Sequence, residues 1–294
     1  MVIKNKIRPN LGDLVFGAVD YLLILFATLL TLYPLIYVVM ASFSNSDILM
    51  GHRGLLWWPI KSTTAAYKAI LAYPSVWSGY RNTLFVLIFG LLVSLCLTIL
   101  GAYFMSRKGV LFGKVFAFMS LFTMYFSGGL VPLYLNVKSL GLYDSLWGVI
   151  MVSGLSTYNM IILRTNFQSI PTAVEESASI DGANDLVILC RIILPLSGSA
   201  IAVMVLYYGV AYWNSWFYPM ILLQDKTKIP LQLVLRDLLI KNQTQQLSES
   251  QSSASIEQTV KYAVIVISTL PLLCVYPFLQ KYFVKGVMIG SVKG

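Results

Sequence analysis

The sequence predicts an all-α, polytopic membrane protein with six transmembrane helices. Hydrophobic residues make up 57% of the chain and charged residues 11%, with a mean hydropathy of +0.75, whereas a soluble domain carries roughly a quarter charged residues. The charges leave six uncharged runs, and a helix of about 20 residues crosses a ~30 Å hydrocarbon core. Helices satisfy their backbone polar groups internally in lipid, so we expect spans near 17–43, 82–106, 115–137, 145–163, 195–222 and 261–280.

The first span is expected to stay in the mature protein. Basic residues precede it within an N-terminal segment, 1–16, as they do in a secretory signal. However, the apolar run over 21–43 is too long for a signal core, and no small-residue cleavage site follows it.

Short basic loops predict the orientation of the chain in the membrane. An even number of spans places both termini on one side. Basic residues concentrate in the short loop between the second and third spans and in the tail, and such loops face the cytoplasm. We therefore expect a cell-membrane protein with both termini cytoplasmic. The residues concerned are Arg107, Lys108, Lys114, Lys281, Lys285 and Lys293.

Two segments on the outer side are long enough to matter. The first, 45–80, contains Trp57 and Trp58, which are typical of an aromatic belt at the headgroups, and a short helical pattern over 64–71. The second, an extracytoplasmic loop over 223–260, becomes rich in Ser and Gln from 242 to 258. Such a polar stretch cannot bury a core of its own.

Catalytic, cofactor-binding and metal-ligating patterns are missing from the sequence. The glycine-rich string at 109–115 has three residues between its glycines and lacks the Ser or Thr that a phosphate-binding loop requires. His52 is the only histidine. The uncharged runs contain no ionisable group for ion coupling, which weakens a secondary-carrier reading. We expect a transport subunit that is not an enzyme, binds no nucleic acid and is driven by another polypeptide.

The most informative stretch is the cytoplasmic segment 164–194. Ser169 is positioned to cap a short helix whose first residue is Pro171. Gly182 can supply the left-handed residue that ends it, and a second short helix is expected from about Asn184. The result is a helix–glycine–helix knob of a size suited to a cleft in a partner. The alternative is an amphipathic connector that lies on the membrane.

A known signature matches this stretch at every spacing. Residues 176–178 (Glu-Ser-Ala), Gly182 and 192–195 (Ile-Ile-Leu-Pro) resemble the EAA motif of ABC importer permeases. Ser177 stands where the first alanine is usual, which is a small-for-small change. The string over 175–183 looks like the version found in carbohydrate-uptake permeases of the maltose-transporter type.

The resemblance covers most of the chain. Residues 82–84, 101–107, 127–132, 212–217 and 280–294 also look like that family. The string Pro-Leu-Gln-Leu-Val-Leu-Arg at 230–236 is similar to the branch of lipoprotein-associated permeases that handle complex or acidic oligosaccharides.

The resemblance implies a type I ABC importer permease fold and a set of partners. These are a second homologous permease, an ABC ATPase dimer that binds the ATP and Mg²⁺, an extracytoplasmic solute-binding (lipo)protein and an oligosaccharide. The segment inserted into the ATPase is the coupling helix. Its contact residues would be Glu175, Glu176, Ser177, Ala178, Asp181, Gly182, Ala183, Leu194 and Pro195.

Aromatic and amide side chains in the fourth and fifth spans are candidates for the sugar path, since sugars bind by aromatic stacking and a few polar contacts. The alternative is that these rings only pack between helices. An ABC permease for a non-sugar solute and a secondary carrier remain the alternative functions. The candidate path residues are Tyr158, Asn159, Tyr212, Trp213, Asn214 and Trp216.

Overall fold

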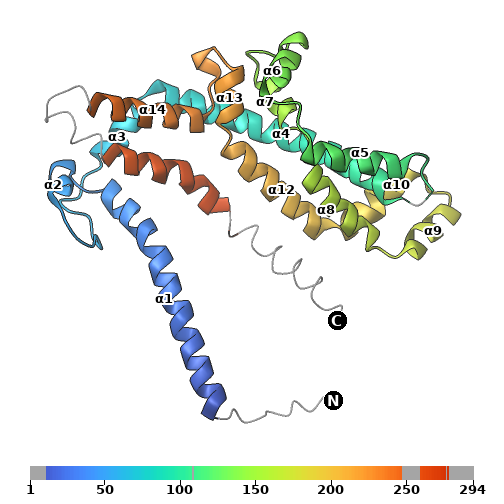
Figure 1. The fold of residues 1–294 in the computed structure, drawn as a ribbon, viewed down its shortest axis with the longest axis horizontal. Coiled ribbons are helices and arrows are strands. Elements are labelled where there is room, and N and C mark those ends of the chain that lie inside the picture. Colours follow the sequence, from blue (N-terminus) through green and yellow to red (C-terminus); the bar gives the residue numbers. More distant parts are fainter. Residues whose placement is uncertain (1–10, 108, 247–258, 276, 278–294) are drawn as a thin grey trace. The chain divides into compact units, whose positions relative to one another are not determined.

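The described structure is entirely helical in its regular elements, as the sequence predicts (Figure 1). It is a computed structural model that describes residues 11–107, 109–246, 259–275 and 277. Lys108, most of the Ser/Gln-rich stretch and the C-terminal motif therefore lie outside the described residues. The chain divides into two compact units, Met1–Ala72 with Asn242–Ile267 and Tyr73–Lys241 with Ser268–Gly294, and each is described separately.

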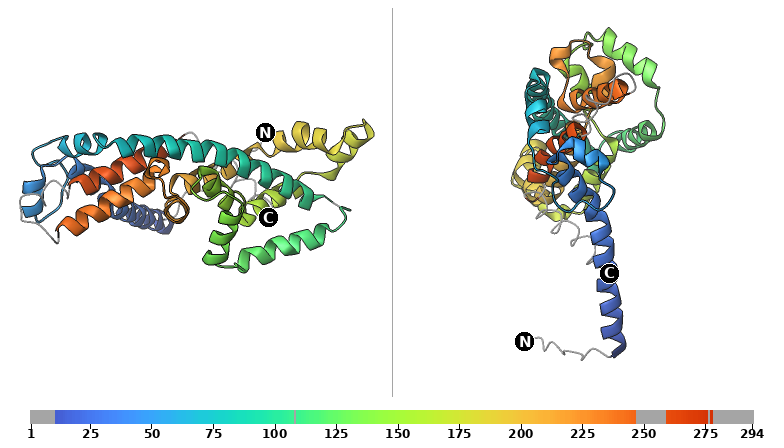
Figure 2. Two further views of the ribbon diagram at one scale, coloured as in Figure 1. Left: turned by 90° about the horizontal axis from the view of Figure 1, so that it is seen from above. Right: turned by 90° about the vertical axis from the view of Figure 1, so that its left-hand side faces the viewer.

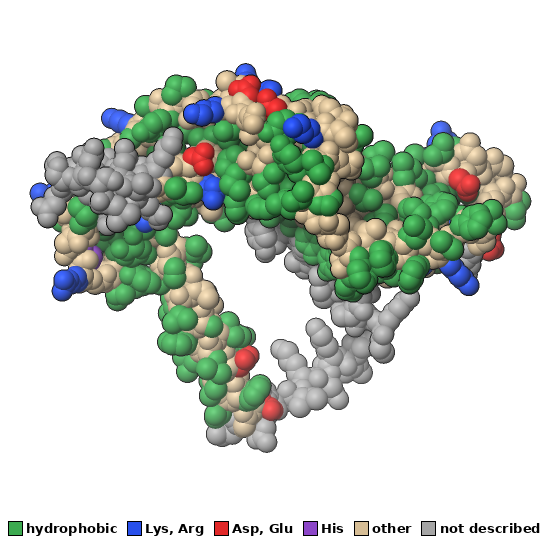
Figure 3. Space-filling view, turned by 45° about the horizontal axis from the view of Figure 1, so that its top comes forward, with side chains coloured by type: hydrophobic (Ala, Val, Ile, Leu, Met, Phe, Trp, Pro, Cys, Tyr) green, Lys and Arg blue, Asp and Glu red, His purple; other side chains and the backbone are tan. Residues whose placement is uncertain are grey.

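The first unit contains a long, apolar helix, α1 (Leu11–Ser42). Hydrophobic side chains cover its exposed surface along its length (Figure 3). The hydroxyls of Thr28 and Thr31 donate to the carbonyls of Ile24 and Ala27, at 2.7 and 3.0 Å. The helix thus satisfies the hydroxyls in its apolar stretch with its own carbonyls, as lipid requires.

The first unit has a small hydrophobic core at the C-terminal end of α1. Two short helices, α2 (Ser46–Gly51) and α3 (Ala65–Leu71), follow α1. Ala41, Leu49 and Leu56 are buried together. Trp57 packs against the ring of Tyr33, with ring centroids 5.4 Å apart. The partly exposed Trp57 and the exposed Trp58 remain candidates for the predicted aromatic belt.

The second unit is built around α4 (Pro74–Ser106), which packs against α8 (Thr157–Gln168) and α12 (Gly198–Trp213). Figure 2 shows α4 and α12 running side by side. Val86 of α4, Met204 and Tyr208 of α12, and Val149 and Ile150 of α7 (Leu146–Val152) form one buried cluster. A second cluster joins the C-terminal end of α4 to the segment that follows α8.

Two of the expected spans are broken helices, and a third bends sharply near its beginning. α5 (Gly113–Tyr125) and α6 (Leu130–Ser139) meet at 116°, and α7 (Leu146–Val152) and α8 at 55°. Asp185–Leu196 and α12 meet at 84°. Glycine at 128 and 129, and Ser153 and Gly154, stand at the first two breaks, where helix propensity is low.

By length and composition, two described helices can each cross a membrane, and up to five spans result if each bent pair is one span. A shorter apolar helix, Thr259–Val275, occupies the sixth expected run. The number six therefore stays a prediction.

The segment between α12 and the last described helix is more ordered than its composition suggests. α13 (Phe217–Leu222) and the short η2 (Lys226–Lys228) precede α14 (Leu231–Gln246). Helix α14 extends four residues beyond 242, into the Ser/Gln-rich stretch that was expected to bury no core of its own. Gln and Lys are good helix formers, so the polarity of this stretch did not prevent helix formation.

Candidate functional site

The helix–glycine–helix segment lies where the sequence predicts it. It consists of α9 (Thr172–Ile180), a turn at Gly182 with φ +82°, and α10 (Asp185–Ile188). The side chain of Asn184 caps α10 by accepting a hydrogen bond from the amide of Val187 at 2.9 Å.

The predicted cap at Ser169 is wrong. Ser169 ends α8, and its hydroxyl donates to the carbonyl of Asn166 at 2.7 Å. Pro171 occupies the N-cap position instead of the first helical position. No side chain caps α9, but none of its residues is buried, so water can reach the unpaired amides of its first turn.

The surface of α9 is exposed, and none of its residues is buried. Glu176 and Ser177 are exposed, whereas Ala178 and Ala183 are partly buried against the core below. Two apolar side chains that sequence reasoning did not single out also stand in the open. Ile180 is 86% exposed and Leu186 66%. Together these residues form an apolar tip with an acidic flank, which is suited to contact with another protein.

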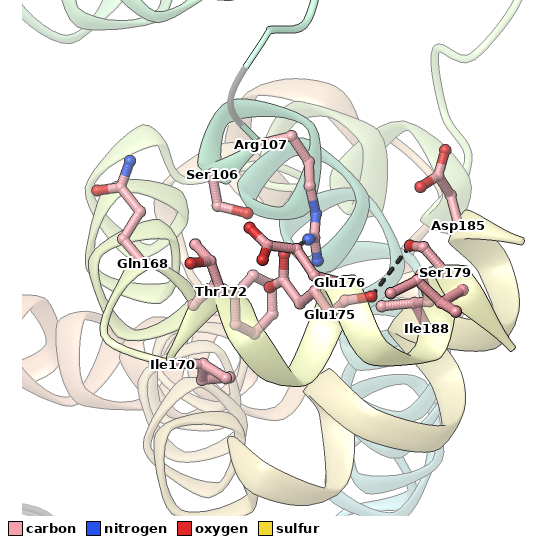
Figure 4. Close-up of a pocket in the computed structure, with 12 residues that line it drawn as sticks. Ser106, Arg107, Gln168, Ile170, Thr172, Glu175, Glu176, Ser179, Asp185 and Ile188 are labelled. Carbon is pink, nitrogen blue, oxygen red and sulfur yellow. Dashed lines mark hydrogen bonds and ion pairs between the residues drawn. The ribbon is translucent and has the colours of Figure 1, made fainter. Parts of the chain in front are cut away.

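An arginine at the end of α4 holds this segment in place. Arg107 donates to the carboxylate of Glu175 in an ion pair, and the two side chains point toward each other in Figure 4. The guanidinium of Arg107 also lies over the ring of Tyr103, 4.0 Å from the centroid. The hydroxyl of Tyr103 donates to the carbonyl of Asp185 at 3.0 Å. α9 and α10 are thus both tied to α4. Neither Tyr103 nor Arg107 was among the predicted site residues, although both stand in the string at 101–107.

A pocket of about 680 Å³ opens beside this ion pair (Figure 4). The end of α4, the end of α8 and the inner side of α9 supply its walls. Its lining is Ser106, Arg107, Phe167, Gln168, Ile170, Thr172, Glu175, Glu176, Ser179, Ile180, Asp185 and Ile188.

The chain leaves this segment through a widened helical turn. Leu189–Ile193 is a π-helix, directly before Leu194 and Pro195. Proline cannot donate to the helix ladder, and a single π turn is a common adjustment at functional sites. Asp181 caps the end of α9. All nine predicted coupling residues therefore fall on one continuous segment, which the core cluster of α4 and α8 supports.

A second pocket, of about 580 Å³, lies between α8 and α12. It contains two of the predicted path residues, Tyr158 and Asn159. The rest of the lining is Ser153, Ser156, Leu206, Tyr207, Tyr208, Val210 and Ala211.

Two other predicted path residues are buried between helices. Tyr212 is 3% exposed, and its hydroxyl is within hydrogen-bond distance of Ser94, at 2.8 Å, and of the carbonyl of Ser153, at 3.2 Å. Trp213 is 5% exposed, and its indole nitrogen donates to the carbonyl of Ser268 at 2.9 Å. Both rings therefore serve helix packing in this conformation.

The last two predicted path residues are exposed and meet α14. The guanidinium of Arg236 lies over the ring of Trp216, 4.6 Å from the centroid. The amide nitrogen of Gln232 donates to the side-chain oxygen of Asn214 at 3.5 Å. Gln232 and Arg236 were not predicted. The one sequence signal that could have identified these two residues as a pair is their spacing of four, which places them on one face of a helix.

Charged groups fix the loop that leads to α14. The carboxylate of Asp144 accepts the amides of Gln224 and Asp225, at 2.9 and 3.0 Å, and the ammonium of Lys228 at 3.0 Å. Hydrogen bonds from the backbone amides of Asp225 and Gln224, and then from the side-chain ammonium of Lys228, lower the pKa of the Asp144 carboxyl below its usual value. The hydrogen bond to Asp144 raises the pKa of Lys228. We call Asp144, Gln224, Asp225 and Lys228 the loop anchor.

The beginning of α4 holds the same loop from another side. The side-chain amide of Asn82 donates to the carbonyls of Thr227 and Ile229, at 2.7 and 3.2 Å. The hydroxyl of Thr83 accepts the amide of Leu231 at 2.9 Å. Buried side chains at the beginning of α4 therefore hold the loop before α14 and the first residue of α14.

The fold and these sites define a helical membrane transport subunit. The permease YtcP of the polygalacturonan/rhamnogalacturonan transport system of Bacillus subtilis (strain 168) is 42% identical over 282 residues, which cover 95% of this chain and 98% of that protein. Protein LplC of the same organism is 39% identical over 90% of each chain. The chain belongs to the family of permease subunits of sugar ABC transporters.

A solved structure supports the same assignment. The crystal structure of a bacterial ABC transporter involved in the import of the acidic polysaccharide alginate contains a chain 35% identical to this one. The two superimpose with a TM-score of 0.84 over 95% of this chain and all of the other. No protein-family model matches the sequence.

Proposed function

We propose that this chain is one of two permease subunits of a binding-protein-dependent ABC importer that takes up acidic oligosaccharides. The observation that carries the proposal is the exposed segment of α9, Gly182 and α10, with the EAA spacing and an apolar tip at Ile180 and Leu186. This segment would be the coupling helix, inserted into a cleft of the ATPase. ATP hydrolysis takes place on that partner, and this chain binds no cofactor.

The motion of the ATPase would reach the membrane helices through α4. α9 is tied to the end of α4 by Arg107 and Glu175, and α10 by Tyr103. The buried cluster beneath them includes Phe167 and Ile188 and makes this region a packed body. Packed interiors transmit displacement with little compression. A push on α9 would therefore move α4 and α8 together.

The relatives support an acidic oligosaccharide as the solute. One belongs to a polygalacturonan/rhamnogalacturonan transport system, and the solved structure belongs to an importer of alginate, which is an acidic polysaccharide. Within this chain, Tyr158 and Asn159 line a pocket between α8 and α12, which would form part of the sugar path in the paired complex. Tyr212 and Trp213, which are buried, would hold the helices of this path in place without contacting the sugar.

The remaining parts of the assembly follow from the family. A second homologous permease, an ATPase dimer and an extracytoplasmic binding (lipo)protein complete the importer. The chain would cross the membrane six times with both termini in the cytoplasm, and segment 223–260 would face the binding protein. The apolar surface of α1 would contact lipid and the second permease, because it has few contacts within its own unit.

The experiment that tests the proposal changes the glycine between α9 and α10. Gly182 has φ +82° and open space around its Cα. Valine is strained in this region, whereas asparagine tolerates it. Gly182→Val should leave the complex in the membrane with ATP hydrolysis no longer coupled to uptake, and Gly182→Asn should retain most uptake. The measurements are uptake of a labelled oligogalacturonate and ATPase activity in proteoliposomes.

Two outcomes would contradict the proposal. Normal uptake in Gly182→Val would mean that the segment does not transmit the work of the ATPase. Uptake by the chain without any ATPase partner would identify a secondary carrier instead.

A further inference from the structure

The exposed pairs Trp216–Arg236 and Asn214–Gln232 form one surface cluster between the end of α12 and the first two turns of α14. Trp216 is 39% exposed and Asn214 is exposed, while Gln232 and Arg236 are partly exposed. We call these four residues the α14 cluster. Asn214 and Trp216 belong to the end of the fifth expected span, and Gln232 and Arg236 to the loop that follows it. The cluster shares no residue with the pocket that holds Tyr158.

The guanidinium of Arg236 has no carboxylate partner among the described residues. It lies over the ring of Trp216, and its Nη1 contacts only the sulfur of Met220, at 3.4 Å. A thioether is a weak acceptor. Stacking uses the flat face of a guanidinium and leaves its in-plane N–H donors free. Arg236 is therefore held in position with most of its hydrogen-bonding capacity unused.

The backbone beneath the cluster is fixed in advance. The loop anchor holds residues 224–228, and Asn82 and Thr83 hold the next turn. A Cβ built on Gly79 would lie 3.0 Å from the Cα of Leu231, so α4 and the start of α14 are in close contact. A preorganised arginine loses less entropy on binding than a free one does.

We propose that the α14 cluster is a subsite for a carboxylate-bearing sugar unit, with Arg236 as its specificity-determining residue. The in-plane donors of Arg236 would bind the carboxylate in the bidentate geometry that guanidinium and carboxylate share. Asn214 and Gln232 would bind sugar hydroxyls through their amides. The exposed surface of the Trp216 ring would pack against the C–H groups of the sugar ring. This inference rests on the proposed function and assigns residues to its acidic-solute specificity.

The test measures direct binding of sugar to the assembled permease–ATPase complex in nanodiscs, without binding protein. The probes are trigalacturonate and its fully methyl-esterified form, compared by saturation-transfer NMR. Arg236→Gln should weaken trigalacturonate binding about ten-fold, because a hydrogen bond to a charged group contributes roughly this factor, and leave the ester unchanged. Arg236→Lys should weaken it too, since lysine keeps the charge but loses the fork.

Arg81→Gln is the matched control. Arg81 is an exposed arginine on α4, next to Asn82, with no described carboxylate partner. Its removal changes the net charge by the same amount and should leave both probes unaffected.

Two results would overturn the inference. Equal loss of both probes in Arg236→Gln would show that the residue does not recognise a carboxylate. Unchanged trigalacturonate binding, with more liganded binding protein needed to stimulate ATP hydrolysis, would identify the α14 cluster as a docking surface for that protein. Failure of the proposed function gives a different result, in which the wild-type complex transports no acidic oligosaccharide at all.

Discussion

Close approaches between single residues set the packing of the α4–α12 pair. A Cβ built on Gly90 would lie 2.6 to 2.9 Å from three ring carbons of Tyr212. Tyr212 cannot retreat easily, because its hydroxyl bonds Ser94 across the same contact. The glycine therefore sets the distance between the two helices, as small residues do at helix contacts in membranes.

Gly90→Ala should destabilise the protein. Alanine gains up to about 1 kcal/mol of helix propensity, but overpacking costs about 1–3 kcal/mol, and here it also threatens the Tyr212–Ser94 hydrogen bond. Gly209→Ala is the matched control, because a Cβ there meets only a methyl carbon of Leu87, at 4.0 Å. The measurement is the midpoint of thermal unfolding in detergent. Equal midpoints for the two variants would contradict this account.

Arg107 provides a second test at the residue scale. Arg107→Gln should reduce uptake per ATP hydrolysed, because the tie between α4 and α9 is lost; coupling free energies between sites are about 1–3 kcal/mol, or about 5- to 150-fold. Arg107→Glu combined with Glu175→Arg should restore part of the coupling. Arg53→Gln, at an exposed site in the first unit, is the control. Full coupling in Arg107→Gln would show that the ion pair has no role in transmission.

At the scale of elements, the sequence predicts helices well and their junctions poorly. Uncharged runs and the EAA spacing located α1, α4, α9 and α10. The bends of 116° and 84° were not predicted, because hydropathy averages over a window and does not register a few residues that leave the helix. Of the Ser/Gln-rich stretch 242–258, only 242–246 is described, and it continues α14. Polar composition alone does not exclude a helix.

Side-chain partnerships were the least predictable part of the candidate site. Tyr212, Trp213, Asn214 and Trp216 looked equivalent as neighbouring aromatic and amide residues. Helix geometry separates them, because Tyr212 and Trp213 face the interior while the other two follow the end of α12. Arg236 contacts Trp216 from α14, a different helix that begins at Leu231. The hydrophobic periodicity of a sequence carries no information about contacts between separate helices.

The loop anchor makes a prediction about pH. The lowered pKa of Asp144 means that its contribution to stability is present above the unfolded-state value of about 3.9 and is lost as pH falls through the folded-state value. Because the pKa of Lys228 is raised, its contribution to stability is fully present throughout the neutral range. That contribution is lost only at high pH. The amides of Gln224 and Asp225 should therefore be protected from hydrogen exchange at neutral pH and lose protection below about pH 4.

Hydrogen-exchange mass spectrometry, corrected for the intrinsic rate at each pH, would measure this protection. Asp144→Asn removes the titrating group and should abolish the acid-dependent step, leaving lower protection at neutral pH. An unchanged acid step in Asp144→Asn would assign the transition to another group.

At the scale of the whole molecule, the chain is one subunit of an ABC transporter, and ATP hydrolysis belongs to a separate subunit. Its sequence signals include residues 175–183, outside the expected spans, and residues 82–84, at the beginning of the second span. Side chains of both stretches make contacts with other elements in the structure. The family assignment rests on agreement over nearly the full length, with 42% identity to one relative and a TM-score of 0.84 to a solved chain.

The span of α4 has a thermodynamic consequence. This one helix of 33 residues, about 50 Å long, holds the loop before α14 through Asn82 and Thr83 and holds α9 through Arg107. If occupation of the α14 cluster by an acidic sugar biases the position of α4, it changes the affinity of α9 for the ATPase. Linkage then requires the ATPase to change the affinity for the sugar by the same factor. The affinity for the sugar would be measured with and without the ATPase, and the affinity for the ATPase with and without the sugar. The two resulting ratios must be equal.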